Sequence, residues 1–319
     1  MKVSVIIPVG DRARYGEAKA SLERSIARSR ECVGEVEWEL VEVDDSARRG
    51  VSWARNEGLR RARGEYLAWM DADDEVEEAW ATEIARALKG APDVVTLDAK
   101  LVGWKRRGDL VWGEESPTLE KLKVAVYRDD VRWGALWLYV TRRELWEGIW
   151  FDEGVKVAED YLVMPRVLER ARSCGYIAQK LYRYICNEGS LINTVARQEL
   201  KDWMLPWERR MAEVPEKYKR ICRWERAASC YWLCDWAAVR GDEAGAPPRQ
   251  LAEDCRGIIR REFWWLLGEA MRARDLRGLD RVRWGARFAC AVWGIWWLQR
   301  WRAFGGASAA RGCAIGRYR

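Results

Sequence analysis

The sequence predicts an α/β domain with a mostly parallel sheet, followed by a helical and basic C-terminal segment. Over residues 1–100, short apolar runs alternate with segments of helical periodicity, a pattern typical of strands joined by crossover helices. Two of the apolar runs end in clusters of aspartates. From residue 201 onward the pattern is helical and rich in tryptophan and arginine. We therefore expect one domain over 1–200 and a second region over 201–319.

The predicted strands are short runs of apolar residues. Residues 3–9 form a nearly continuous run, as expected of a strand buried on both faces. Pro8 should end this strand, because proline cannot donate to a sheet ladder. By the same criterion, further strands are expected at 38–43, 66–70, 94–97 and 135–140.

The predicted helices lie between these strands. Apolar residues four apart predict a helix over 16–30, and shorter helices are expected over 54–63 and 160–171. Asp74 precedes a segment with a one-sided apolar face and is expected to be its N-cap. That face consists of four residues at regular spacing: Val76, Trp80, Ile84 and Leu88.

The composition excludes several kinds of chemistry. The chain of 319 residues is 49% hydrophobic and 33% charged, so it is globular rather than disordered. It contains no histidine, which excludes imidazole bases and histidine metal sites. Any metal ion must therefore be held by carboxylates, thiolates, backbone groups or ligand oxygens. The nine cysteines include no CxxC pair and are expected to be free thiols in a reducing cytoplasm.

The C-terminal part carries most of the positive charge. Residues 256–319 contain 14 arginines and four acids, a net charge of +10 against +6 for the whole chain, which leaves −4 for residues 1–255. The same segment holds seven of the 22 tryptophans. Arginine and tryptophan together are typical of a membrane interface, so residues 256–319 are a candidate for peripheral contact with the inner face of a membrane. The alternative is a helical cap with an arginine-rich solvent face.

No targeting or spanning segment is expected. Residues 3–7 already read as a strand, so no leader peptide is predicted before them. No apolar run reaches the ~18–20 residues of a spanning helix. These observations predict a cytoplasmic protein.

The acidic cluster Asp71-Ala72-Asp73-Asp74 follows one of the predicted strands. In open α/β sheets, ligands bind outside the carboxyl ends of the strands. Carboxylate oxygens at such a place suit a hard divalent cation, Mn²⁺ or Mg²⁺, beside the phosphates of a nucleotide. The alternative is an acidic turn that only caps a helix or faces solvent.

Several motifs, taken in order, resemble those of family 2 glycosyltransferases over residues 1–195. Val3–Val9 resembles the opening strand of that family, and Val43–Ser46 resembles its second-strand acidic motif. Asp71–Asp74 occupies the place of its DxD motif. The remaining matches are Ala54–Leu59 with Arg63–Tyr66, Phe151–Gly154 with Ala158–Asp160, and Leu181–Tyr184 with Asn187, Gly189 and Ser190.

The resemblance implies a GT-A fold, with a Rossmann-like nucleotide-binding sheet, and a site for a nucleotide-sugar donor. Asp44 or Asp45 would hydrogen-bond the base, which is usually uracil, and Arg55 would lie near the base or the phosphates. Asp71 would face the ribose, with Ala72 beside it, and Asp73 would bind the metal ion together with Asp71. The base pocket would be lined by Pro8, Val9 and Asp11.

The resemblance also implies the reaction. Asp160, with Glu159 beside it, would deprotonate an acceptor hydroxyl, because a neutral hydroxyl is a poor nucleophile. The sugar would pass from the donor, expected to be a UDP-sugar, to a saccharide or lipid-linked acceptor with inversion at the anomeric carbon. Surface polysaccharide assembly is the setting that the family implies.

Each site residue also has a structural interpretation. Asp160 begins a predicted helix, where the helix dipole favours acids. One of Asp44 and Asp45 can serve simply to end a strand. Arg55 can be a surface residue of its helix, and the alternating Tyr182 and Tyr184 are more typical of core packing.

Three other functions remain open. A sugar nucleotidyltransferase would need a glycine-rich basic loop after the first strand, for which residues 10–12 are a poor match. A nucleic-acid-binding protein would use the basic tail but leaves the aspartate clusters unexplained, so nucleic acid is not the expected partner. A transferase that binds nucleotide without turnover is the third, because only seven residues separate Ser46 from Ala54, where relatives carry a longer insertion.

Overall fold

The computed structural model describes residues 1–10, 15–103, 108–112, 116–127, 134–155, 158–186, 205–240 and 249–272. The chain divides into two compact units. Unit 1 consists of Met1–Val126 and Val131–Thr194, and unit 2 consists of Tyr127–Asp130 and Val195–Arg319. Asp11, the predicted motif residues at 187, 189 and 190, and the tail beyond residue 272 lie outside the described residues.

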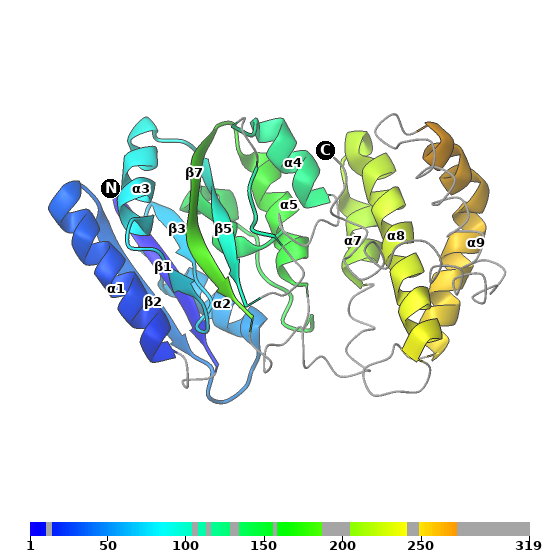
Figure 1. The fold of residues 1–319 in the computed structure, drawn as a ribbon, viewed down its shortest axis with the longest axis horizontal. Helices are drawn as coiled ribbons and strands as arrows, with labels where there is room; N and C mark the ends of the chain where they lie inside the picture. Colours follow the sequence, from blue (N-terminus) through cyan, green and yellow to red (C-terminus); the bar gives the residue numbers. More distant parts are fainter. Residues whose placement is uncertain are drawn as a thin grey trace. The chain divides into compact units, whose positions relative to one another are not determined.

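Unit 1 alternates strands and helices (Figure 1). Its strands are β1 (Lys2–Val9), β2 (Glu37–Asp44), β3 (Tyr66–Trp69), β4 (Glu75–Val76), β5 (Val94–Val102), β6 (Tyr139–Arg142) and β7 (Cys174–Ile185). Its helices are α1 (Tyr15–Cys32), α2 (Val51–Arg61), α3 (Trp80–Ala87), α4 (Leu119–Tyr127) and α5 (Asp160–Arg170). Short 3-10 helices are η1 (Leu88–Gly90), η2 (Leu136–Leu138) and η3 (Arg143–Trp146).

The described strands of unit 1 form one sheet in the order β2-β1-β3-β6-β5-β7-β4. The pairs β1–β2, β1–β3 and β5–β7 are parallel, whereas β3–β6, β5–β6 and β4–β7 are antiparallel. Five of these seven strands therefore point the same way, and β6 and β4 run against them. The sheet is mixed, as the late strand β6 enters between β3 and β5, and the predicted α/β class is confirmed.

The centre of the sheet is buried on both faces and mostly apolar. Residues Val3 to Ile7 of β1 are fully buried, as are Tyr66 and Leu67 of β3. Pro8 does not end β1, which continues to Val9 and pairs with β2 there. β3 pairs with β1 only as far as Ile6, so the missing N–H of Pro8 falls where β1 has a neighbour on one side only.

Three predictions about elements are corrected. The segment 135–140 is not one strand: η2 is followed by β6. α2 begins at Val51, three residues before its predicted start. Asp74 is not the N-cap of α3, because β4 intervenes and α3 begins at Trp80 after Ala79, which makes no side-chain cap bond.

Unit 2 is helical in its described part. It contains α7 (Leu205–Glu213), α8 (Glu216–Arg240) and α9 (Arg249–Arg272), and α8 packs along α9 (Figure 1). The apolar core between them includes Leu233, Ile259 and Leu266. Arginines of α8 pair across with Glu262 and Glu269 of α9. Among the described residues, no helix has the length and apolar character needed to cross a membrane.

Candidate active site

The predicted donor residues gather at one edge of the sheet. Val9 is aligned with Asp44 at the ends of β1 and β2. Ile6 is aligned with Trp69, the last residue of β3, so Asp71 follows at the same edge. Because the carboxyl ends of adjacent parallel strands form the ligand crevice of such sheets, this edge is the candidate donor site.

The two aspartates after β2 have different surroundings. Asp45 is buried, and its two carboxylate oxygens accept the N–H groups of Arg49 (2.6 Å) and Gly50 (2.8 Å). Its own N–H donates to the carbonyl of Val9 (2.8 Å). Asp44 is exposed and accepts the N–H of Ser46 at 2.9 Å. Asp45 thus holds the loop that leads into α2, and Asp44 is the aspartate that faces solvent at the strand end.

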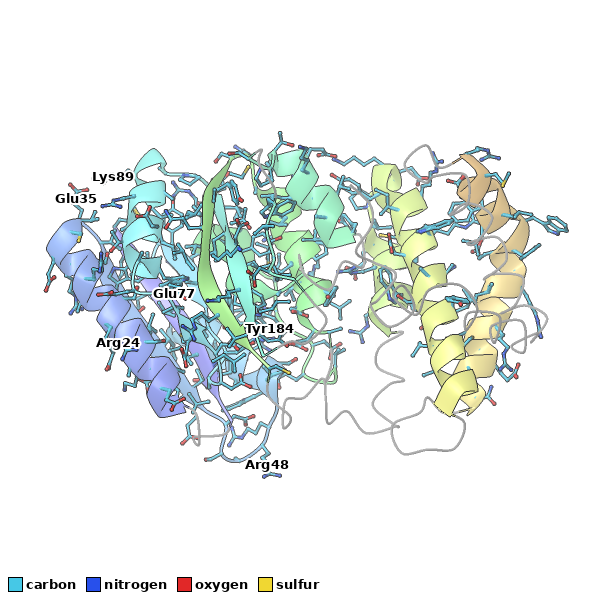
Figure 2. The ribbon with its side chains drawn as sticks, viewed as in Figure 1. Arg24, Glu35, Arg48, Glu77, Lys89 and Tyr184 are labelled. Carbon is cyan, nitrogen blue, oxygen red and sulfur yellow. The ribbon has the colours of Figure 1, made fainter. Side chains whose placement is uncertain are left out.

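The loop between β2 and α2 is short and strained at one point. Arg48 has a φ of 54°, a left-handed conformation that a side chain rarely adopts. Its side chain points outward from the loop (Figure 2). Gly50, with a φ of 108°, then turns the chain into α2.

The turn after β3 is fixed by β7. The buried carboxylate of Asp74 accepts the hydroxyl of Tyr182 (2.8 Å) and the N–H of Ile185 (2.8 Å). The Tyr182 oxygen accepts the N–H of Asp71 (3.1 Å). Burial, with the charges of Asp71 and Asp73, raises the pKa of Asp74 well above its ordinary value. Asp74 is therefore a structural part of the turn.

Asp71 and Asp73 fit a metal ion only if a substrate shares it. The side chain of Asp71 is 32% exposed, and Asp73 is half-buried. Among the described residues, no three side chains of the ligating kinds come together as a metal site. Mg²⁺ is commonly held by one or two carboxylates with phosphate oxygens completing its shell. Two carboxylates beside a diphosphate meet that requirement.

Arg55 is buried between the two acidic groups of the site. Its Nη2 lies 3.2 Å from Asp71 Oδ1, and its Nη1 donates to Glu159. The guanidinium carbon lies 5.7 Å from the centre of the Phe151 ring. Burial alone would lower the pKa of Arg55, but Glu159, Asp71 and Asp160 outweigh it and raise the pKa above its ordinary value. The side chain is 7% exposed, so it is not the surface residue that its helix position allowed.

Asp160 opens α5, next to Glu159. Burial, together with the charge of Glu159, raises the pKa of Asp160 to about 7, and Arg55 opposes this shift. Its Oδ1 accepts the N–H of Tyr161 (2.9 Å). The residue before the pair, Ala158, has a φ of 60°. Left-handed backbone in a residue with a side chain is a form of strain that clusters at functional sites. A carboxylate whose pKa is raised toward neutrality suits general base catalysis.

Two residues of α2 that the sequence did not single out as site residues hold the segment before Asp160. Asn56 bonds to both backbone groups of Phe151, and Ser52 Oγ donates to the carbonyl of Val155 (3.1 Å). The sequence signal that could have identified Asn56 is the Ala-Arg-Asn motif, in which it follows Arg55.

A group of stacked aromatic rings was also not predicted. Trp137 lies face to face with Tyr182 and Tyr184, with ring centres 4.4 Å and 5.4 Å away.

The remaining predicted residues line the same edge. Pro8 is half-buried, and Val9 and Ala72 are buried. Tyr184 lies at the end of β7 that carries the contacts to Asp74 (Figure 2). Together with the mixed sheet and the acidic turn after β3, these features define an α/β domain of the GT-A class.

Comparisons with known proteins agree with this class. The profile of the family described as Glycosyl transferase family 2 matches residues 25–138. The uncharacterized glycosyltransferase EpsJ of Bacillus subtilis (strain 168) is 28% identical over 163 residues, which cover 47% of this chain and 46% of EpsJ. The succinoglycan biosynthesis protein ExoO of Rhizobium meliloti (strain 1021) is 29% identical over 178 residues, which cover 52% and 50%. The chain spans about half the length of the curated relatives it matches.

A solved structure is similar in fold over nearly the whole chain. Residues 1–349 of TarS from S. aureus, crystallised with UDP-GlcNAc, superpose with a TM-score of 0.62 over 94% of this chain and 92% of that chain, at 16% identity. Residues 25–138 of this chain are thus similar to glycosyltransferase family 2, and the fold is that of the GT-A class.

Proposed function

We propose that the protein is an inverting, metal-assisted glycosyltransferase that moves a sugar from a UDP-sugar to a saccharide or lipid-linked acceptor. The observation that carries the proposal is the arrangement around Arg55, which joins Asp71 of the donor turn to Glu159, next to Asp160. A carboxylate with a pKa of about 7 is thereby tied to the turn where a nucleotide diphosphate would bind.

The chain's own residues account for the steps. Asp71 and Asp73 would hold Mn²⁺ or Mg²⁺, which when bound supplies charge neutralisation for the leaving diphosphate. Asp44 faces the base, and Arg55 keeps Asp71 and Glu159 in place. Asp160 takes the proton of the acceptor hydroxyl while the oxygen of that hydroxyl bonds to the anomeric carbon. The bond from that carbon to the diphosphate breaks on the opposite side, which inverts the centre.

Two comparisons support the substrate classes. TarS from S. aureus was crystallised with UDP-GlcNAc and with UDP, which favours a UDP-linked donor here. The relative ExoO is named for succinoglycan biosynthesis, which favours an acceptor in polysaccharide assembly.

We further propose that residues 256–319 contact the cytoplasmic face of a membrane. In the described part of this segment, Trp264 is 79% exposed and Met271 is 54% exposed, both on α9. An indole ring on a helix that also carries several arginines suits the headgroup layer. Sedimentation with vesicles of anionic lipid tests this contact, and equal recovery with and without vesicles would contradict it.

The donor site is tested by calorimetric titration of UDP, with GDP in parallel, with and without Mn²⁺. We expect wild type to bind UDP in a metal-dependent way and Asp73→Asn to lose that binding. Glu78→Gln is the matched control, because Glu78 is an exposed acid of the same region that pairs with Arg28 on the surface. If wild type binds neither nucleotide under any condition, the donor site described above is wrong.

Turnover separates an active enzyme from a protein that only binds nucleotide. UDP release is measured from UDP-glucose, UDP-galactose and UDP-N-acetylglucosamine, with water as the default acceptor. Metal-dependent UDP binding without any UDP release, even with added saccharide acceptors, would favour a binding protein over the transferase.

A further inference from the structure

One face of α2 is attached to the segment that leads into α5. Ser52, Arg55 and Asn56 lie three and four residues apart, on one side of the helix. All three bond to residues between 151 and 159, about a hundred positions further along the chain. Arg55 reaches Glu159 itself, and the other two reach the backbone before it. This face of α2 is therefore the support on which the segment rests.

The amide of Asn56 is fully used. Its Oδ1 accepts the N–H of Phe151 at 2.9 Å, and its Nδ2 donates to the carbonyl of Phe151 at 3.0 Å. The second Nδ2 hydrogen goes to Glu153 Oε1 at 2.9 Å. A carboxamide has two donors and an acceptor oxygen, and here both donors and the oxygen are satisfied by the segment. Asn56 is 3% exposed, so water does not compete for these bonds.

Phe151 links this attachment to the donor turn. Its ring centre lies 5.6 Å from that of Trp69, edge to face, and 5.8 Å from that of Trp146. Trp69 is the last residue of β3, directly before the turn that carries Asp71. Phe151 is thus held at two points: Asn56 bonds to its backbone, and its ring packs against the end of β3, the strand that leads into the donor site.

The attachments continue toward Asp160. Ser52 fixes the carbonyl of Val155, Ala158 has left-handed backbone, and Glu159 then meets Arg55. A strained residue persists only where its surroundings over-determine it. The hydrogen bonds on either side of Ala158 supply that constraint, and they set the direction in which α5 begins with Asp160.

We propose that Asn56 is a positioning residue for Asp160: by gripping Phe151 and Glu153 it holds the segment so that the carboxylate of Asp160 meets the acceptor hydroxyl. The proposal rests on the proposed function, because it assumes that Asp160 is the base. Asn56 does not contact the donor residues of the turn. Its loss should therefore affect the chemical step and leave donor binding in place.

The test is Asn56→Asp, which keeps the size of the side chain and the acceptor for Phe151 N–H but removes both donated bonds. We expect kcat for UDP release to fall on the order of 100-fold, the scale of effect that a misplacement of about 1 Å produces. The KM for the donor and the calorimetric affinity for UDP with Mn²⁺ should stay within about twofold of wild type. Hydrogen exchange should rise at the amides of residues 151–155.

Glu57→Gln is the matched control on the same helix. Glu57 pairs with Arg60 and Arg61 on the surface, so kcat and exchange in the segment should be unchanged. Ser52→Ala is the milder second variant and serves if Asn56→Asp does not fold. It removes one hydrogen bond, and we expect a fall in kcat of about tenfold with UDP affinity retained.

Two outcomes would overturn the proposal alone. One is an Asn56→Asp enzyme whose segment exchanges faster while kcat stays at the wild-type value. The other is a loss of UDP affinity as large as the loss of kcat, which would mean a general role in folding. Failure of the proposed function looks different: wild type itself releases no UDP, and the inference about Asn56 is then contradicted with it.

Discussion

Replacing Arg55 with leucine should destabilise unit 1 by about 3–5 kcal/mol at neutral pH, the usual cost of removing one partner from a buried ion pair. The guanidinium is 7% exposed and bridges Asp71 and Glu159. Leucine fills part of the same space but leaves the carboxylate of Glu159, which is 8% exposed, without its cation. An uncompensated charge in such a place is costly because water cannot solvate it.

The destabilisation should shrink as the pH falls. Without Arg55, the pKa of Asp160 in the folded state rises further above its value in the unfolded chain, because Arg55 is the cation that opposes that rise. A carboxyl whose folded pKa is raised binds its proton more tightly in the folded state. The cost is therefore complete above the raised pKa and is relieved as the pH falls toward the unfolded value of about 4. In wild type, burial and the charge of Glu159 already raise the pKa of Asp160 to about 7, so the destabilisation by its charged form is likewise relieved as the pH falls.

The assay is urea denaturation followed by tryptophan fluorescence at about pH 7.5 and about pH 5.5, compared with wild type at each pH. Arg60→Leu is the control, because Arg60 is on the same helix but is 51% exposed, and its loss should cost within about 0.5 kcal/mol. Arg55→Leu combined with Glu159→Leu should recover much of the stability. If Arg55→Leu costs no more than Arg60→Leu, or if its cost grows toward low pH, the buried pair does not stabilise the site as argued.

Two further predictions concern the base and the donor turn. Asp160→Asn should abolish UDP release while keeping UDP affinity, and wild-type kcat/KM should rise with pH around an apparent pKa of about 7, since only the deprotonated carboxylate can accept a proton. A flat profile between about pH 5.5 and about 8.5 would exclude Asp160 as the titrating base. Tyr182→Phe removes the hydroxyl between Asp74 and Asp71, so it should cost about 1–3 kcal/mol and weaken metal-dependent UDP binding. Tyr184→Phe is its control in both measurements, and equal effects of the two changes would show that the hydroxyl of Tyr182 has no special part.

The general plan of the donor edge followed from local patterns. Apolar runs that end in acids predict strands whose carboxyl ends carry a site, and Val9, Asp44 and Asp71 do lie at one edge of the sheet. The predictions of these strands and of their ends are confirmed, because strand burial and strand ends are encoded within a few neighbouring residues. The order of strands is a different matter, since β6 inserts between β3 and β5 from far along the chain.

The sequence could not predict which of the acidic residues anchor a loop or turn and which face solvent. Asp44 and Asp45 are neighbours of the same type, and only the return of the loop at Arg49 and Gly50 shows that Asp45 anchors it. Asp74 was expected to cap a helix, but its partner Tyr182 is 108 positions away. A contact between residues so far apart in the chain produces no local pattern in the sequence.

The burial of Arg55 has the same explanation. Its helix supplies few apolar residues, and the pattern allows a surface position as readily as a buried one. The acids that receive its charge, Asp71 and Glu159, lie on two other segments of the chain. Only the folded structure shows that these two segments meet at Arg55.

The dependence of the donor turn on β7 has a consequence for how the protein is made. Asp71 and Asp74 are held in place by hydrogen bonds to Tyr182 and Ile185 of β7, and β4 pairs with β7 as well. During synthesis, chains emerge from the N-terminus, and long-range pairings form late because loop closure must come first. The turn therefore leaves the ribosome about a hundred residues before its partner strand. A nascent chain that has β1 and β3 in place therefore still lacks the contacts that order the turn after β3.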